Sequence, residues 1–349
     1  MDPARSPIFI VGTGRSGTTL LRFMMSAHPR IYITHEASFY LWERLFPRKA
    51  PRRAFLDYYF QSLSYRWLRL DPSLVTEGLP DPLPRERMCD AYAALMRAKA
   101  AHYGRVRFGD KTPSHAAFLG RIFEDFPEAR VIHIVRDPRG VALSLSRMPW
   151  APGSLYANAR FCEVERRQVE PYKRRVLQIR LEDLLGDARG TMGRVLEHVG
   201  EPWDDAVLDH ARHIPDPHDM PPFPWLESSA HPRGERGVKW REALTPVEIR
   251  MIERQARRVM AAHGYEPAKL EREPDGLAIW WQGFKQLPLR LHALGCYAHM
   301  AWRARDARNF DSEKSNQLWH RLNPPAWQHY PGFVLPPAPP LPSRVLPAA

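Results

Sequence analysis

A glycine-rich stretch near the start of the sequence combines residue types that bind anions. Gly12, Gly14 and Gly17 are spaced through GTGRSGTTLLR, which also contains Arg15. Glycines let the backbone turn sharply and approach a ligand closely, and the N-terminus of a following helix presents N–H groups with a partial positive charge. The stretch therefore predicts a phosphate-binding loop that leads into a helix.

Three kinds of phosphate ligand are compatible with this loop. The three glycines spell the GxGxxG fingerprint of dinucleotide-binding enzymes, and Glu36 follows them at the distance of a ribose-binding carboxylate, which favours an NAD(P)-dependent oxidoreductase. The same glycines approximate the loop of nucleoside triphosphatases, but Thr18 stands where those proteins need a lysine for the terminal phosphates. In the third interpretation, Arg15 supplies the cation from within the loop.

A second segment carries further groups for a phosphate. In VIHIVRDPRGVALSLSR, an apolar run delivers Arg136 to the end of a predicted strand, and Ser144 follows on the next predicted helix. A guanidinium fork and a serine hydroxyl suit a phosphate dianion. Asp137 comes only after Arg136, so the segment gives little support to the magnesium carboxylate that a kinase would place there.

With these motifs the sequence resembles the PAPS-dependent sulfotransferases, where PAPS is 3′-phosphoadenylyl sulfate, and in particular the branch of tyrosylprotein enzymes and bacterial relatives. The 5′-phosphosulfate loop of that branch reads PRSGTT or PKSGTT. This sequence has the same pattern with a glycine in place of the proline, in residues Gly14, Arg15, Ser16, Gly17, Thr18 and Thr19. Glu36 has the place of the branch's catalytic glutamate.

The resemblance implies roles for residues further along the chain. Arg136 and Ser144 would hold the 3′-phosphate of PAPS. Lys111, in the block FGDKTPSH, would lie near the bridging oxygen and stabilise charge on the leaving group. A looser match, PRGERGVKWREALTP, resembles a late segment that wraps the 3′-phosphate, and its candidates are Arg233, Gly234 and Lys239.

The implied reaction is in-line transfer of a sulfuryl group (EC 2.8.2 type) from PAPS to a hydroxyl, with release of adenosine 3′,5′-bisphosphate and without a metal. Glu36 is the expected general base, and Arg15 and Lys111 are the expected catalytic cations. His35 is the rival base, because cytosolic relatives use histidine. Neighbouring residues on an extended segment point to opposite sides, so only one of the two should face the sulfate.

The acceptor is not identified by the sequence. A sugar, a lipid, a phenol and a peptidyl tyrosine all offer the required hydroxyl. A noncatalytic nucleotide-binding module is a further alternative, and it gains support from the basic aromatic segment near the C-terminus. No oligomeric state is predicted.

The elements that must position these residues form a regular pattern. Short apolar runs alternate with helical patterns along the first two thirds of the chain. This is typical of an α/β fold, here a P-loop-like three-layer sandwich with a central parallel sheet flanked by helices. The runs that predict strands are residues 8–11, 31–33, 106–109, 131–135 and 176–181.

The resemblance runs from about residue 8 to residue 264 and implies a sulfotransferase catalytic domain over residues 1–265. Composition separates from it a basic aromatic helical extension (266–322) and a flexible proline-rich tail (323–349). Residues 277–308 contain three tryptophans, Trp280, Trp281 and Trp302, together with several arginines and a lysine. Such a segment either contacts an anionic membrane or packs on the core.

Composition excludes several classes of protein. Lys and Arg total 51 against 39 Asp and Glu, for a net charge of +12, but no nucleic-acid-binding motif accompanies this charge, so nucleic acid is not an expected partner. The three cysteines form no CxxC pair, which argues against a zinc site or a disulfide scaffold. No secretion signal or membrane span is recognised, and a cytoplasmic location, with membrane association as an addition, is expected.

Overall fold

The computed structural model describes residues 6–46, 52–80, 83–148, 151, 153–215, 239–288, 291 and 294–295. Within them, five parallel strands form one sheet in the order β2-β3-β1-β4-β5. The strands are β1 (Ile8–Val11), β2 (Ile31–His35), β3 (Arg107–Lys111), β4 (Arg130–Val135) and β5 (Val176–Arg180). Each lies within a residue or two of a predicted strand, so the parallel α/β sheet expected from the sequence is confirmed.

Both faces of the sheet are apolar because strand side chains alternate between them. In β1, Phe9 and Val11 join one buried cluster, whereas Ile8 and Ile10 join another. The sheet is therefore buried on both sides, as a parallel sheet requires.

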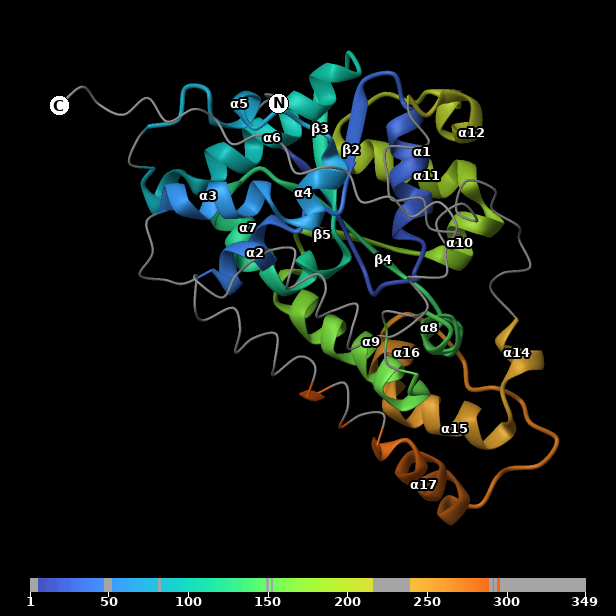
Figure 1. The fold of residues 1–349 in the computed structure, drawn as a ribbon. Helices are drawn as coiled ribbons and strands as arrows, with labels where there is room; N and C mark the ends of the chain where they lie inside the picture. Colours follow the sequence, from blue (N-terminus) through green and yellow to red (C-terminus); the bar gives the residue numbers. More distant parts are fainter. Residues whose placement is uncertain are drawn as a thin grey trace, which may run out of the picture.

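Helices cover each face (Figure 1). One face packs against α1 (Thr18–Ala27), α10 (Leu181–Gly186) and α11 (Ala188–Val199), and α12 (His210–His213) packs on α1. The other face packs against a layer made of α2 (Phe39–Leu45), α3 (Arg52–Phe60), α4 (Leu63–Leu68), α5 (Ser73–Thr76), α6 (Met88–His102) and α7 (Leu119–Asp125). Short 3-10 helices are η2 (Arg85–Arg87), η3 (Pro113–Phe118), η4 (Glu170–Tyr172) and η5 (Asp205–Val207).

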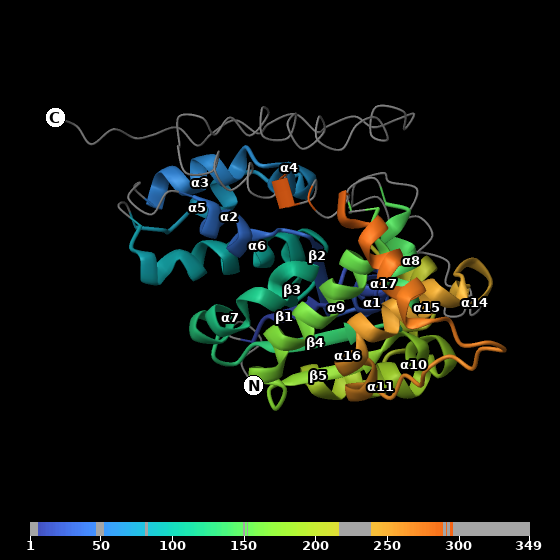
Figure 2. The same ribbon diagram turned by 90° about the horizontal axis from the view of Figure 1, so that it is seen from below.

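A third group of helices gathers beside α8 and α9 (Figures 1 and 2). Asp137 begins α8 by accepting a hydrogen bond from the backbone N–H of Arg139, and Thr245 and Glu248 form a capping box that begins α15. The group comprises α8 (Pro138–Ser146), α9 (Leu155–Val169), α14 (Trp240–Ala243), α15 (Pro246–Gln255), α16 (Arg257–Ala262) and α17 (Gly276–Lys285).

The strand order places the candidate residues at one edge. The chain adds β2 and β3 on one side of β1 and then crosses to add β4 and β5 on the other. Open parallel sheets bind ligands outside the carboxyl ends of the strands, at the point where the order reverses. The loop after β1, Glu36 after β2, Lys111 at the end of β3 and Arg136 after β4 all lie at this edge.

Candidate active site

The glycine-rich loop after β1 adopts a shape that two of its glycines permit. A Cβ atom on Gly12 would lie 2.5 Å from the carbonyl oxygen of Ile134 in β4. Gly17 has φ of 96°, and a Cβ atom there would lie 2.6 Å from Leu181. Gly17 precedes the first residue of α1, Thr18, and no side chain caps this helix in the described structure. The first N–H groups of α1 thus face the loop, as an anion site requires.

Arg15, in the glycine-rich loop, contacts Arg136 and Ser144, the two residues predicted to bind the 3′-phosphate. Its Nε donates a hydrogen bond to Oγ of Ser144 on α8 at 3.2 Å. Its carbonyl oxygen accepts a hydrogen bond from Nη1 of Arg136 at 3.0 Å. A Cβ atom on Gly140 would lie 3.0 Å from Nε of Arg136, so the Arg136 side chain packs against the first turn of α8. Two guanidinium groups and a hydroxyl therefore meet beside the loop.

Glu36 and Lys111 form an ion pair at the ends of β2 and β3. Nζ of Lys111 lies 2.6 Å from Oε1 of Glu36, and the backbone N–H of Glu36 donates to the carbonyl of Lys111. The Lys111 side chain is fully buried, whereas that of Glu36 is 43% exposed. Burial lowers the pKa of Lys111 and the charge of Arg22 adds to this, while the Glu36 carboxylate opposes the shift. The carboxylate is the member of the pair that an incoming molecule can reach.

Backbone strain is concentrated at the glycine-rich loop after β1 and at the turn after β2. Of the four non-glycine residues with positive φ in the described ranges, three belong to the site: Arg15 (73°), Glu36 (40°) and Ser38 (52°). Such conformations are costly for residues with a Cβ atom and persist where surrounding contacts hold them, which is common at functional sites.

Asp110 is a positioning residue that the sequence interpretation missed. Its Oδ1 accepts hydrogen bonds from Oγ1 of Thr34 at 2.8 Å and from the backbone N–H of Ala37 at 3.0 Å, so it holds the turn that carries Glu36. Nδ1 of His115 lies 3.3 Å from its other oxygen. Burial by itself raises the pKa of Asp110, but His115 and the hydrogen-bond donors outweigh it and the pKa falls below its usual value.

His35, the rival base, faces the interior. It is buried, and within the described residues its Nδ1 has no hydrogen-bond partner. Burial holds the pKa of His35 well below its usual value, and the nearby charges of Lys111 and Arg22 lower it further. The ring is therefore neutral, and its burial favours Glu36 as the base that an acceptor can contact.

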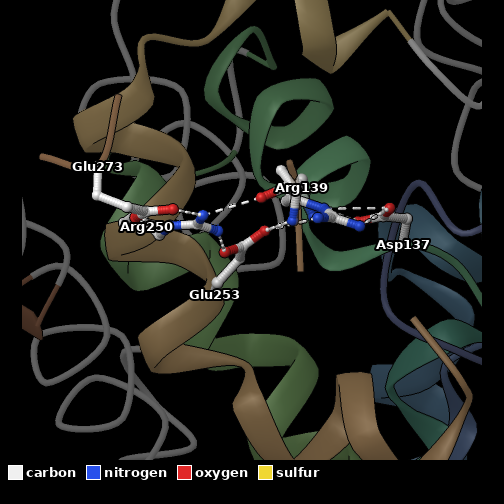
Figure 3. Close-up of polar contacts among 6 residues, drawn as sticks. Asp137, Arg139, Arg250, Glu253 and Glu273 are labelled. Carbon is white, nitrogen blue, oxygen red and sulfur yellow. Dashed lines mark hydrogen bonds and ion pairs between the residues drawn. The ribbon is translucent and has the colours of Figure 1, made fainter. Parts of the chain in front are cut away.

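A chain of charged side chains begins at Asp137, the residue that follows Arg136 in the sequence (Figure 3). Arg139 pairs with Asp137 at 2.7 Å and with Glu253 of α15 at 2.6 Å. Glu253 also pairs with Arg250, which in turn pairs with Glu273. These ion pairs link α8 to α15 and to the segment that contains Glu273. They also hold Asp137, which follows Arg136 in the sequence. Arg139 and Glu253 were not predicted as site residues.

The segment PRGERGVKWREALTP, which was predicted to bind the 3′-phosphate, lies only partly within the described residues. Arg233 and Gly234 lie outside the described residues. Lys239 is exposed where α14 begins. Its neighbour Trp240 is buried and joins the charged chain, because the guanidinium carbon of Arg139 lies 4.0 Å from the centre of its ring.

Within the described residues, no group of three or more His, Cys, Asp or Glu side chains is arranged to hold a metal ion. None of the helices described is both long and apolar enough to span a bilayer.

The fold and site define an α/β protein that presents a glycine loop, two arginines and a lysine–glutamate pair at one sheet edge, which is an arrangement for an anionic nucleotide. Comparison with known proteins identifies the family. Residues 7–205, more than half of the chain, match the profile of the sulfotransferase family. The chain belongs to this family, as the resemblance in its motifs predicted.

Similar proteins of known name include the protein-tyrosine sulfotransferase of Drosophila melanogaster, 29% identical over 226 residues, which are 61% of this chain and 42% of that protein. Protein-tyrosine sulfotransferase A of Caenorhabditis elegans is 28% identical over 219 residues, or 59% of this chain and 53% of the relative. The chain thus spans about half the length of these relatives.

Among solved structures, the sulfotransferase domain of the Synechococcus PCC 7002 olefin synthase shares the fold. The TM-score is 0.57 and the sequence identity is 23%, with 75% of this chain and 96% of that domain covered. The three-layer architecture predicted from the sequence is therefore that of a sulfotransferase domain.

Proposed function

We propose that this protein is a PAPS-dependent sulfotransferase that transfers a sulfuryl group to a hydroxyl acceptor, with Glu36 as general base. The observation that carries the proposal is the Lys111–Glu36 ion pair of 2.6 Å at the end of β3. Gly12 in the neighbouring loop donates its backbone N–H to the carbonyl of Pro113, just beyond Lys111, so the pair adjoins the anion-binding loop. An exposed carboxylate and a buried ammonium group thus lie beside the glycine-rich loop, which supports the proposal.

The residues of the site fit a nucleotide with phosphates at both ends. The N-terminus of α1 and the loop residues Gly14, Ser16, Gly17, Thr18 and Thr19 would bind the 5′-phosphosulfate together with Arg15. Arg136 and Ser144 would bind the 3′-phosphate. Both residues contact Arg15, so the groups proposed for the 3′-phosphate adjoin the loop proposed for the 5′-phosphosulfate, which favours this assignment. Arg233, Gly234 and Lys239 remain candidates for the same phosphate. Bound PAPS supplies the sulfuryl group and leaves as adenosine 3′,5′-bisphosphate.

The chain's own groups would act as follows. Glu36 accepts the proton of the acceptor hydroxyl, because its carboxylate is the exposed member of the ion pair. Lys111 and Arg15 stabilise negative charge that develops on the oxygens around sulfur, and the burial of Lys111 strengthens this effect by excluding water. Asp110 fixes the turn that carries Glu36, so the base is held in place before the acceptor binds.

The acceptor class is open, and the similar proteins suggest where to begin. Two of them are named protein-tyrosine sulfotransferases, which makes peptidyl tyrosine the first acceptor to test, followed by phenols, sugars and lipid alcohols.

The test is transfer of labelled sulfate from PAPS to a panel of these acceptors. We expect turnover by the unmodified chain and a loss of about 100-fold or more in Glu36→Gln, which removes the base. Glu43→Gln on α2, the matched control, should keep full turnover. Equal turnover by both variants would contradict the role of Glu36 and leave the family intact. Nucleotide binding without transfer to any acceptor would favour the noncatalytic module, and binding of NAD(P) instead would favour the oxidoreductase.

Helix α17 contains the first residues of the segment 277–308, for which a membrane contact was predicted. Leu277, Trp280, Trp281 and Phe284 are exposed on it, and Lys285 lies next to them. We propose that the basic aromatic segment, residues 277–308, binds anionic lipid surfaces as a peripheral element of a separate extension that begins at residue 266. Co-sedimentation with vesicles that contain anionic lipid tests this, and equal recovery with neutral vesicles would contradict it. The division at residues 265 and 322, the cytoplasmic location and the absence of a nucleic-acid partner stay predictions.

A further inference from the structure

One side chain of the glycine-rich loop is anchored to a buried carboxylate. The hydroxyl of Thr13 donates a hydrogen bond to Oε2 of Glu165 on α9. Glu165 is only 8% exposed, and it comes from a part of the sequence that carries none of the predicted site residues. The loop therefore has a fixed point beneath it in addition to its contacts with Arg136 and Ser144.

Glu165 is itself held by a second buried group. Its Oε1 lies 2.6 Å from Nε2 of His133 in β4, and Nδ1 of His133 lies 3.3 Å from the amide nitrogen of Gln178 in β5. The imidazole ring of His133 therefore lies between the Gln178 amide and the Glu165 carboxylate, and it fixes the carboxylate that receives the Thr13 hydroxyl.

Anchoring Thr13 fixes the start of the turn that presents Arg15. The carbonyl oxygen of Thr13 accepts a hydrogen bond from the backbone N–H of Ser16 at 3.0 Å, which closes the turn. Arg15 lies inside this turn with a φ of 73°, a conformation that its surroundings must hold. A loop that is already shaped for an anion loses less conformational entropy when the anion binds.

We propose that Glu165, oriented by His133 and Gln178, is the positioning residue of the phosphate loop and acts through the hydroxyl of Thr13. The identity of the anion, the 5′-phosphosulfate of PAPS, rests on the proposed function, but the anchoring does not. Charge alone would predict the opposite effect, because a carboxylate behind an anion site repels the anion. Glu165→Gln, which removes the charge, should therefore weaken binding if Glu165 shapes the loop and strengthen binding if its charge dominates.

The experiment compares Thr13→Val with Thr13→Ser in the full-length chain. Binding of adenosine 3′,5′-bisphosphate and of PAPS is measured by calorimetry, and the unfolding midpoint is measured in parallel. Thr13→Val keeps the shape of the side chain but cannot donate, and we expect about tenfold weaker binding, the size of one hydrogen bond to a charged group. Thr13→Ser, which keeps the hydroxyl, should recover most of the affinity.

A purely structural role predicts a different pattern. It would lower the unfolding midpoint of Thr13→Val and leave both affinities and the KM for PAPS unchanged, and this result would overturn the proposal. The proposal instead expects a higher KM for PAPS with the KM of the acceptor unchanged. Tighter binding by Thr13→Val would also overturn it.

Glu165→Gln provides a second measurement on the same anchor. If Glu165 acts through Thr13, adding Thr13→Val to Glu165→Gln should weaken binding by much less than it does in the unmodified chain. Fully additive effects would contradict the coupling. If the unmodified chain binds neither nucleotide, the proposed function fails; if it binds and Thr13→Val binds equally well, only the present inference fails.

Discussion

The two halves of the proposed nucleotide site are each backed by a buried carboxylate, but the carboxylates have different partners. Behind the loop after β1, Glu165 accepts a hydrogen bond from the hydroxyl of Thr13 and contacts the imidazole ring of His133. In the chain of charged side chains that begins at Asp137, Glu253 lies between two arginines, Arg139 and Arg250 (Figure 3). The first carboxylate is held by a hydroxyl and an imidazole ring, whereas the second is held by two guanidinium groups.

The different partners of Glu165 and Glu253 indicate different roles for the two carboxylates. Removing one member of a buried ion pair leaves an uncompensated charge, which is strongly destabilising, whereas losing the Thr13 hydroxyl leaves one hydrogen bond unmade. We infer that the charged chain mainly holds α8 and α15 together and that the Glu165 network mainly sets the shape of the loop. Stability should then depend mainly on the charged chain, and nucleotide affinity mainly on the Glu165 network.

The largest effect on stability is expected from Arg139→Met. The substitution leaves Asp137 and Glu253 buried without their shared cation, and we expect the free energy of unfolding to fall by about 3–5 kcal/mol. The matched control is Arg241→Met, which removes an exposed arginine that also contacts the ring of Trp240. Denaturant unfolding measures both variants. Similar losses in the two would show that the charged chain does not carry this stability.

A smaller loss is expected from Glu165→Gln. The amide keeps the size of the side chain and can still accept one of the two hydrogen bonds, so the free energy of unfolding should fall by about 1–3 kcal/mol. The same denaturant series provides the comparison. A loss as large as that of Arg139→Met would remove the distinction between the two supports.

Gly140→Ala tests the half of the site formed by Arg136. A Cβ atom at this position would lie 3.0 Å from Nε of Arg136 and displace the guanidinium group. We expect adenosine 3′,5′-bisphosphate to bind about three- to tenfold more weakly, because a charge-assisted contact is disturbed but not removed. Gly193→Ala on α11 is the control, since nothing lies within 4 Å of its Cβ position. Unchanged affinity in Gly140→Ala would argue against Arg136 as a phosphate ligand.

The smallest effect concerns the pH dependence of stability that arises from His263, a neighbour of His133. His263, whose ring centre lies 6.3 Å from that of His133, has its pKa lowered from 6.5 to about 4, first by burial and then by the charges of His133, Arg180 and Arg166, while Glu170 opposes them. The unfolded chain therefore binds this proton at higher pH than the native chain, so stability falls as the pH drops from about 6.5 to about 4. His263→Gln should flatten this part of a stability-against-pH curve. An unchanged slope would contradict the shift.

The sequence predicted the sheet and the residues at its edge because their signals are local. Apolar runs mark the strands, and glycines mark the loop whose shape Gly12 and Gly17 permit. Asp110 and Arg139 lie inside motifs that had been singled out, yet their roles depend on partners brought together only by the fold: Ala37 for Asp110 and Glu253 for Arg139.

Glu165 could not have been predicted. It lies on a helix rich in charged residues, and nothing in its neighbourhood sets it apart from a solvated glutamate. Its importance comes from the contact with Thr13, far away in sequence, which exists only because the fold brings α9 next to the loop after β1. The pairing of His133 with Gln178 likewise depends on the parallel register of β4 and β5, which places them opposite each other.

The central claim is that this sheet edge binds the nucleotide of a sulfotransferase. Calorimetric titration of the full-length chain with adenosine 3′,5′-bisphosphate, beside NAD⁺ under the same conditions, tests it most directly. We predict saturable binding of the bisphosphate at one site per chain and no binding of NAD⁺. Binding of NAD⁺ without binding of the bisphosphate would contradict the claim.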